Sequence, residues 1–253
     1  MKRFAWAFLL LAFASQAHAS GVALRWGSCE GQSNRNFACD KSTGSELLVG
    51  SFDPPPGISQ LLGIEVILSI AAADGTVPSW WQTFEPGSCR RSSIAAAFDV
   101  SDQAECDDPW SGQAAGGTGQ AAATLVSRYD IGNPVGLNLF LTTAVPLEAA
   151  QSAQSGRKYA AFKLIINHQK SSGAGACSGC DTPVCIRLEA IRLVRPARVN
   201  KDGSRTSNDI DLTGGVGGMG GASQVATWQG GTPNCAAAAS KVSTWSELKK
   251  RFK

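Results

Sequence analysis

Three cysteines occur within nine residues in the segment GACSGCDTPVC, which spans positions 175–185. A Cys-x-x-Cys pair can be a redox centre when a helix N-terminus stabilises the thiolate, or part of a zinc site when further ligands complete it. The turn-forming residues DTP and the aliphatic, β-branched run at 184–194 instead favour a loop that enters a strand. Structural disulfides are therefore the favoured interpretation, and His168 or Cys235 would be the fourth ligand of a zinc site.

All eight cysteines of the chain lie after residue 19. An even number of cysteines in an exported chain usually forms disulfides, because the compartment is oxidising. Proximity in the sequence favours the pairs Cys29–Cys39 and Cys89–Cys106 and leaves the pairing of the other four open. The disulfide candidates are Cys29, Cys39, Cys89, Cys106, Cys177, Cys180, Cys185 and Cys235.

The first residues have the features of a secretory signal peptide. Lys2 and Arg3 precede an apolar stretch at 4–14, and an Ala-His-Ala cleavage site ends at Ala19. We expect cleavage there to release a secreted protein, whose destination is the periplasm, the cell surface or the medium. The apolar stretch is short for an uncleaved anchor, and no later segment approaches 18 apolar residues, so no membrane span is expected after cleavage.

The charge of the chain is close to neutral. Removal of residues 1–19 takes away Lys2, Arg3 and His18, so the formal net charge falls from +3 to +1. Nucleic-acid partners normally require a basic face, and we therefore expect no nucleic-acid binding.

The elements that must position these residues are almost all predicted strands. Apolar and polar residues alternate with period two in segments such as VGLNLFLT at 135–142 and CIRLEAIRLV at 185–194. Turn sequences such as DPPPG at 53–57 separate the strands. The pattern predicts an all-β chain that forms an antiparallel β-sandwich, either jelly-roll or immunoglobulin-like. The predicted strands are 22–26, 46–52, 63–70, 93–100, 121–129, 135–145, 159–167, 184–194, 209–212 and 224–228.

The end of the chain has the pattern of a short amphipathic helix. Thr244 and Glu247 form a capping box, and three basic residues follow in the last turn. The helix is expected either to cap the sandwich or to serve as a sorting tag or partner anchor. The residues of its apolar face are Trp245, Leu248 and Phe252.

Two further segments complete the expected organisation. LEAAQSAQ at 147–154 predicts a turn or two of helix, and the Gly-rich segment at 213–223 predicts a loop or linker. The expected units are a signal peptide at 1–19, a β-sandwich domain at 20–212, the Gly-rich segment at 213–223, and a final strand with the C-terminal helix at 224–253.

The sequence carries no signature of a catalytic site. His168 is the single histidine after residue 19, and no nucleophile motif surrounds it, so no catalytic residue is assigned. Paired carboxylates for glycoside cleavage remain an alternative, because that chemistry requires only two acids about 5 to 10 Å apart. The acidic candidates are Glu65, Asp99, Asp102, Glu105, Asp107, Asp108, Asp130 and Glu189.

An acidic cluster at 99–110, DVSDQAECDDPW, suggests a calcium site. Carboxylate oxygens are ligands that this hard cation prefers, but the spacing is not that of an EF-hand. A solvated acidic loop paired with Arg90 and Arg91 is the alternative. The calcium candidates are Asp99, Asp102, Asp107 and Asp108.

Three tryptophans are candidates for ligand binding. Adjacent residues of an extended strand point to opposite faces, so one of Trp80 and Trp81 would face outward and could form a platform for a sugar ring. Trp110 is the third candidate, and packing of these rings in the core is the alternative.

Several short motifs together resemble a group of exported bacterial β-rich proteins to which no activity is assigned. The group shares a Cys-x-x-Cys-x-x-Pro-Val-Cys segment and a C-terminal Ser-Thr-Trp helix, which correspond here to 177–185 and 243–245. The other matching motifs are Trp-Gly-x-Cys at 26–29, Phe-Ala-Cys at 37–39, Val-Gly-Ser-Phe at 49–52, Pro-x-Trp-Trp at 78–81 and Cys-Arg at 89–90.

Two classes of function follow from the sequence. The favoured one is a secreted, disulfide-stapled β-sandwich that acts as a non-catalytic binding or cell-surface module, with a glycan or protein partner. The alternative is an extracellular, carboxylate-dependent glycan hydrolase that binds calcium. An exposed aromatic strip would favour binding, whereas a deep cleft with converging carboxylates would favour the enzyme.

Overall fold

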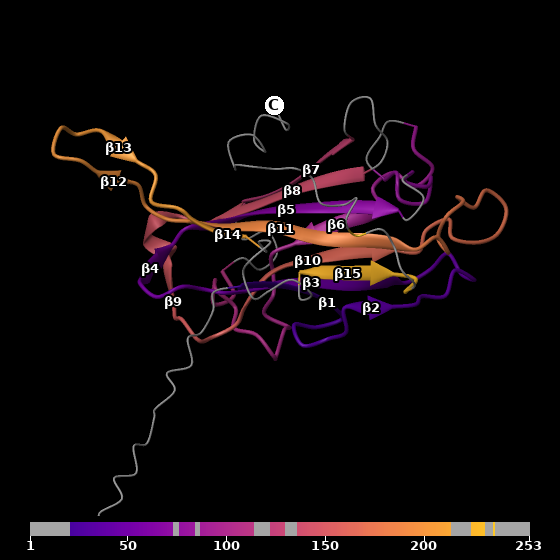
Figure 1. Cartoon of the computed structure of the whole chain (residues 1–253), viewed down its shortest axis with the longest axis horizontal. Helices are drawn as coiled ribbons and strands as arrows, with labels where there is room; N and C mark the ends of the chain where they lie inside the picture. Colours follow the sequence, from indigo (N-terminus) through magenta and orange to yellow (C-terminus); the bar gives the residue numbers. More distant parts are fainter. Residues whose placement is uncertain are drawn as a thin grey trace, which may run out of the picture.

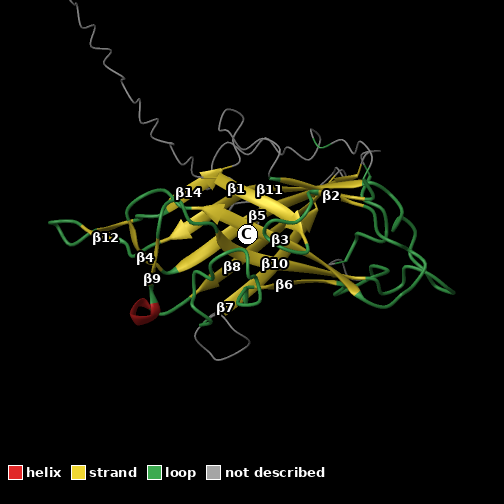
Figure 2. Cartoon of the chain, turned by 90° about the horizontal axis from the view of Figure 1, so that it is seen from below, coloured by secondary structure: helices red, strands yellow, loops and turns green. Residues whose placement is uncertain are grey.

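The computed structural model describes residues 21–72, 76–83, 87–113, 122–129, 136–213, 224–230 and 235, with the backbone alone for 122–129. Strands are the predominant regular element among these residues (Figure 2). Mainly antiparallel pairing links eleven of the fifteen described strands into two main sheets, and the inner faces of both sheets contribute to one apolar core. The protein is therefore the β-sandwich that the strand pattern predicted.

The first sheet has four antiparallel strands. Its order places the N-terminal strand at one edge and the two longest strands in the centre. The strands, in order across the sheet, are β1 (Gly21–Trp26), β3 (Ser45–Asp53), β10 (Tyr159–Asn167) and β6 (Ile94–Ala97).

The second sheet is wider, and its central strands are the longest in the molecule. One edge of β11 pairs with two strands, β15 at the beginning of β11 and β14 at its end. The strands, in order, are β2 (Asn34–Arg35), β15 (Val225–Trp228), β11 (Val184–Val194), β5 (Gly63–Ala72), β8 (Gly136–Ala144) and β7 (Ala122–Tyr129), with β14 (Ile210–Thr213) beside β15 on β11.

Small elements gather at one end of the sandwich (Figure 1). A two-stranded sheet lies there, and a separate hairpin projects from the same end. Figure 2 shows a short 3-10 helix beside the two-stranded sheet. These elements are β4 (Ile58–Leu61), β9 (Gln151–Ala153), η1 (Leu147–Ala149), β12 (Arg198–Val199) and β13 (Arg205–Thr206).

The core forms because alternate residues of each strand point between the sheets. In β5, Ile64, Val66 and Leu68 all face this core. In β3, Gly50 allows the ring of Phe162 to approach closely, since a Cβ at this position would lie 2.0 Å from a ring carbon. The period-two pattern read from the sequence therefore identifies the inner faces correctly.

The strand predictions are confirmed, and one helix prediction is wrong in part. Residues 147–154 contain only the three-residue helix η1, followed by strand β9. Pairing of β9 with β4 holds this segment extended and overrides its helical composition.

Residues 214–223 of the Gly-rich segment and the predicted helix at 243–252 lie outside the described residues. Within the described part of the chain, no helix is long and apolar enough to cross a membrane.

Candidate functional site

All eight cysteines form disulfides, but the two locally favoured pairs are wrong. The structure pairs residues that are far apart in sequence, because the sandwich brings separate loops together at its surface. Cys177 and Cys180 have different partners, so the Cys-x-x-Cys segment is neither a dithiol centre nor a zinc site. The four disulfides are Cys29–Cys106, Cys39–Cys180, Cys89–Cys177 and Cys185–Cys235.

Two of these disulfides lie at one end of the sandwich, which we call the cysteine end. It comprises the loop residues 37–44, 76–83, 87–92 and 168–183, next to Val184 at the beginning of β11. The loop at 168–183 extends at the right of Figure 1, opposite the β12–β13 hairpin. The disulfides of this end tie its loops to one another across 88 and 141 residues of sequence.

Tryptophans fill the interior of the cysteine end. Trp80 and Trp81 are both fully buried, and their ring centroids lie 5.0 and 5.4 Å from that of Trp228. The two residues lie in a turn, in which Trp81 N–H donates to Pro78 O, so they do not alternate between faces as strand residues would. Trp110 is also fully buried. The predicted ligand platform of Trp80, Trp81 and Trp110 is therefore wrong, because no ring is exposed for stacking.

Arg90 is a buried cation that the sequence analysis assigned to surface ion pairs. Its guanidinium donates to the carbonyl oxygens of Trp80 (2.5 Å), Gln169 (2.7 Å) and Asn167. It also lies over the Trp80 ring, 3.3 Å from the ring centroid. Burial lowers the pKa of Arg90 to about 9. Arg90 thus connects three loop carbonyls and has no acidic partner in the acidic cluster.

His168 also has a structural environment. It is buried, its Nε2 lies 2.9 Å from Glu46 Oε1, and its ring lies 5.8 Å from that of Trp228. The backbone N–H of His168 donates to Gly44 O and so closes the end of β10. These contacts fix the imidazole among aromatic rings, away from the surface where a substrate would bind.

The four calcium candidates point to different partners. Asp99 accepts hydrogen bonds from Ser101, and these lower its pKa. Asp102 accepts from Lys163 Nζ at 2.8 Å, and this bond lowers the pKa of Asp102. Asp107 pairs with Arg157, and Asp108 caps the turn at 110–112 through backbone N–H groups. In the part of the chain that the structure describes, no three acidic, histidine or cysteine side chains form a metal-binding group.

The remaining acidic candidates that the structure describes, Glu65, Glu105 and Glu189, lie on different elements. Glu105 accepts hydrogen bonds from the Ser28 side chain and from the backbone N–H of Glu30, which lower its pKa. Glu189 lies on the outer face of the second sheet, where burial raises its pKa and Ser69 Oγ donates to it at 2.5 Å. Glu65 lies on the neighbouring strand β5, and Asp130 lies outside the described residues.

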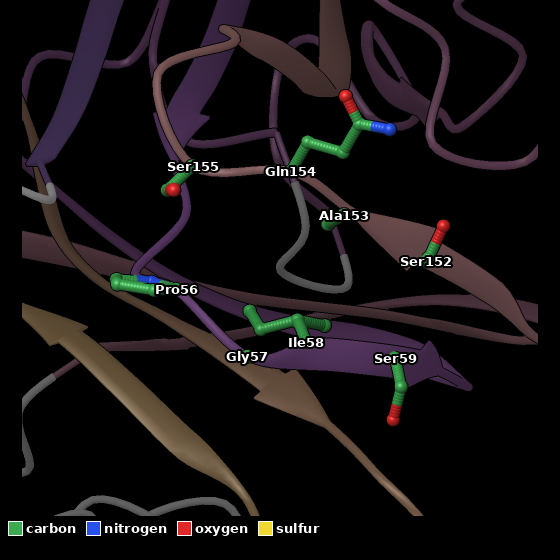
Figure 3. A pocket seen from close by; sticks show the side chains of 8 residues that line it. All are labelled: Pro56, Gly57, Ile58, Ser59, Ser152, Ala153, Gln154 and Ser155. Carbon is green, nitrogen blue, oxygen red and sulfur yellow. The ribbon is translucent and has the colours of Figure 1, made fainter.

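The opposite end of the molecule carries a surface hollow of about 370 Å³ between β4 and β9. Residues 56–59 line one side and residues 152–155 line the other (Figure 3). Ile58 and Ala153 are buried and form an apolar floor, whereas Ser59 and Ser152 are exposed. Gly57 enters β4 with a φ of +88°, a conformation that favours glycine.

A second, more polar hollow of about 270 Å³ adjoins the first and shares Ser152 and Gln154 with it. Its rim includes Asp107, which accepts a hydrogen bond from Arg157 Nη2 at 2.6 Å. This hydrogen bond raises the pKa of Arg157. We call the two hollows together the β4–β9 groove, and the end of the sandwich that contains it the groove end.

Backbone contacts hold the groove in place. Asp107 N–H donates to Lys158 O at 2.9 Å, and Ala160 N–H donates to Asp107 O at 3.0 Å. The Cys29–Cys106 disulfide fixes the residue before Asp107. The groove therefore offers hydroxyls, amides and an ion pair on a rigid frame, which suits recognition of a polar ligand rather than nucleophilic attack.

Two exposed aliphatic residues flank the groove end. Leu147 of η1 and Val199 of β12 are 58% and 68% exposed. Among the described residues, they are the large apolar side chains with high exposure. Figure 1 places β12 at the end that carries β4 and β9, and Figure 2 shows the short helix η1 beside β9.

The sequence analysis missed the groove residues. Ser59, Ser152 and Gln154 are ordinary surface residue types, and no spacing connects the first with the other two. The turn at 53–57 was recognised, but nothing in it predicts that β4 lies beside β9. The groove depends on this pairing of distant segments.

Comparison with known proteins identifies no family. No protein-family model matches the chain, and no curated protein matches it. A cohesin module from the family 33 glycoside hydrolase of Clostridium perfringens ATCC13124 is similar at 6% identity over 78% of this chain and 96% of that one, with a TM-score of 0.30. The second type II cohesin module of the cellulosomal adaptor ScaA scaffoldin of Acetivibrio cellulolyticus is similar at 8% identity, over 76% and 91%, with a TM-score of 0.32.

Proposed function

We propose that the protein is a non-catalytic binding module, exported through its signal peptide, whose β4–β9 groove binds an extended segment of a partner protein. Its four disulfides fit a non-cytoplasmic, oxidising compartment. The observation that carries the proposal is the groove itself, a polar and partly apolar hollow bounded by two short strands.

The strands of the groove suit an extended peptide. Within the described residues, β4 and β9 pair with each other alone, so each has a second edge. A bound peptide can add to such an edge through main-chain hydrogen bonds, while its alternate side chains enter neighbouring hollows. The floor at Ile58 and Ala153 suits an apolar side chain, and the ion pair at Asp107 suits polar groups.

The surface favours a polypeptide over a glycan. Sugar rings commonly stack on exposed aromatic faces, and the three tryptophans considered for this role are fully buried. The exposed apolar residues at the groove end, Leu147 and Val199, are aliphatic. Aliphatic side chains flanking a polar groove resemble the mixed composition of protein interfaces.

An array experiment tests the proposal. The oxidised chain of residues 20–253 is applied to arrayed extended peptides and to arrayed cell-wall glycan fragments. A matched pair of variants, Ser152→Arg in the groove and Thr43→Arg on the exposed surface of the cysteine end, is applied in parallel.

We expect the unmodified protein and Thr43→Arg to bind a common set of peptides, and Ser152→Arg to lose at least ten-fold in affinity. Binding to the glycans alone, or peptide binding that Ser152→Arg leaves unchanged, would contradict the proposal.

A further inference from the structure

The hairpin of β12 and β13 projects from the groove end of the sandwich. Figures 1 and 2 both show it standing away from the two main sheets. Every residue at 197–207 is exposed, and none of them belongs to the apolar core. A two-stranded hairpin that buries so little surface gains little stability from packing. Its shape therefore depends on its own hydrogen bonds.

Those hydrogen bonds define the turn of the hairpin. Asn200 N–H donates to Ser204 O at 2.8 Å, and Gly203 N–H donates to Asn200 O at 3.0 Å. Gly203 has a φ of +79°, a conformation that favours glycine. Asp202 accepts from the backbone N–H and the hydroxyl of Ser204, at 2.9 and 2.6 Å. The hairpin backbone therefore presents its other side chains from defined positions.

The hairpin is basic, and its one acid is already engaged. Its strands and turn contain three basic residues and one acidic residue, a formal net charge of +2. The acid is Asp202, whose pKa the hydrogen bonds from Ser204 lower. In the described part of the chain, no acidic side chain forms an ion pair with Arg198, Lys201 or Arg205. The three cations are thus available to a partner.

The base of the hairpin adjoins the rim of the groove. Arg195 Nη2 lies 3.5 Å from the carbonyl oxygen of Gly57, which lines the larger hollow. Arg195 N–H donates to Asp209 Oδ1 at 3.1 Å and so joins the two sides of the hairpin at its base. Arg198 follows three residues later, about 10 Å along an extended chain. A bound segment that continues past Gly57 by about three or four residues therefore reaches the cations.

The cations are spread over the hairpin rather than gathered in one pocket. Arg205 lies opposite Val199 and shares a face with it, whereas Arg198 lies opposite Thr206 on the other face. Lys201 lies in the turn. Guanidinium groups bind carboxylates through pairs of parallel hydrogen bonds. Cations spaced in this way suit a run of carboxylates, and the exposed Val199 adds an apolar contact for a side chain of the same polypeptide.

We propose that the β12–β13 hairpin binds an acidic stretch of polypeptide that adjoins the segment held in the β4–β9 groove. This inference rests on the proposed function, because the groove positions the partner beside the hairpin, and it adds the partner's chemistry. Carboxylates of the acidic stretch pair with Arg198, Lys201 and Arg205. Because these cations are exposed, they select among partners and speed association more than they raise affinity.

Peptides with matched extensions test the proposal. Each arrayed peptide is prepared with Glu-Glu-Glu, Gln-Gln-Gln or Lys-Lys-Lys at its N-terminus and, in a second set, at its C-terminus. The oxidised chain of residues 20–253 is applied at low and at high salt concentration. The hairpin variant is Arg198→Ser/Lys201→Ser/Arg205→Ser. The control variant removes three exposed cations from the cysteine end instead, as Lys41→Ser/Arg91→Ser/Lys170→Ser.

At low salt, we expect the unmodified protein and the control variant to bind the Glu forms about five-fold more tightly than the Gln forms, and the Lys forms more weakly. The hairpin variant should lose this preference and keep its affinity for the Gln forms, and high salt should remove the preference from all three proteins.

Equal binding of the Glu and Gln forms by the unmodified protein, or a preference that the hairpin variant retains, would overturn this inference and leave the proposed function standing. Binding of the Gln forms that Ser152→Arg leaves unchanged would instead contradict the groove itself, and the inference with it.

Discussion

The two ends of the sandwich use opposite kinds of residues. At the cysteine end, the residue types associated with chemistry, such as Cys177, Trp80, His168 and Arg90, are buried and form disulfides or hydrogen bonds within the protein. At the groove end, common residue types such as serine and glutamine line the hollow that faces solvent. In this protein, cysteine, tryptophan, histidine and arginine side chains hold the loops together, whereas the course of the backbone at β4 and β9 forms the proposed binding surface.

This difference has an energetic basis. A disulfide that closes a long loop stabilises the native chain by roughly 2 to 4 kcal/mol, mainly because it restricts the unfolded state. The two disulfides of the cysteine end close segments of 88 and 141 residues. The groove end has the short pairs β4–β9 and β12–β13, and the groove itself is lined by exposed residues such as Ser59, Ser152 and Gln154. We therefore expect substitutions at the cysteine end to affect stability and those at the groove end to affect binding.

The largest effect is expected from Arg90→Met at the cysteine end. This change leaves three carbonyl oxygens without their donor, and each buried unsatisfied group costs about 1 to 3 kcal/mol. The free energy of unfolding should fall by about 3 to 5 kcal/mol, as measured by urea denaturation. Arg91→Met, at an exposed neighbour, is the control and should change it by less than about 0.5 kcal/mol. Similar values for the two variants would contradict the role given to Arg90.

The second prediction concerns the Cys89–Cys177 disulfide. The double variant Cys89→Ser/Cys177→Ser should lose about 2 to 4 kcal/mol of stability. Equilibrium unfolding of the purified, oxidised variant measures this loss. A loss below about 0.5 kcal/mol would show that the loops of the cysteine end are held mainly by their aromatic contacts.

A smaller, pH-dependent effect distinguishes Glu189 from Asp102. The folded-state pKa of Glu189 is raised, so its stabilising contribution is present below the ordinary glutamate pKa and is lost as the pH rises through the raised value. Glu189→Gln should therefore be more stable than the unmodified protein at neutral pH, by about 1 kcal/mol or less, and this gain should vanish towards pH 4.

Asp102→Asn should show the opposite sign. The hydrogen bond from Lys163 lowers the folded-state pKa of Asp102, so its contribution is present above the ordinary aspartate pKa and is lost as the pH falls through the lowered value. This variant should be less stable at neutral pH, by under about 1 kcal/mol because the Asp102 side chain is 61% exposed to solvent, and the difference should close at low pH. Thermal unfolding from pH 3 to 8 measures the stability of both variants. A change in stability of the same sign in both variants at neutral pH would contradict the environments described for Glu189 and Asp102.

The smallest change in stability is expected at the groove end. Ser152→Arg places a larger side chain on an exposed strand without removing a contact of the core, so the free energy of unfolding should change by less than about 0.5 kcal/mol. Thermal unfolding checks this value, which is required before a loss of binding is attributed to the groove. A loss above about 1 kcal/mol would show that the groove end also contributes to the fold.

The sequence predicts the strands well because their inner and outer residues alternate locally. The segments at 135–145 and 184–194 show this pattern, and β8 and β11 follow it. The disulfide pairs and the buried role of Arg90 could not be predicted, because both depend on which distant loops meet at one end of the sandwich. The groove could not be predicted either, because it depends on the pairing of the distant segments β4 and β9.

Hydrogen exchange with a bound peptide tests the central claim, that the groove end binds an extended polypeptide. The strongest peptide from the array is added to the oxidised chain of residues 20–253, and amide exchange is followed by mass spectrometry. The account predicts slower exchange in β4 and β9 and unchanged exchange in the loops at 76–92 and 168–183. Slower exchange confined to those loops of the cysteine end, with β4 and β9 unchanged, would contradict it.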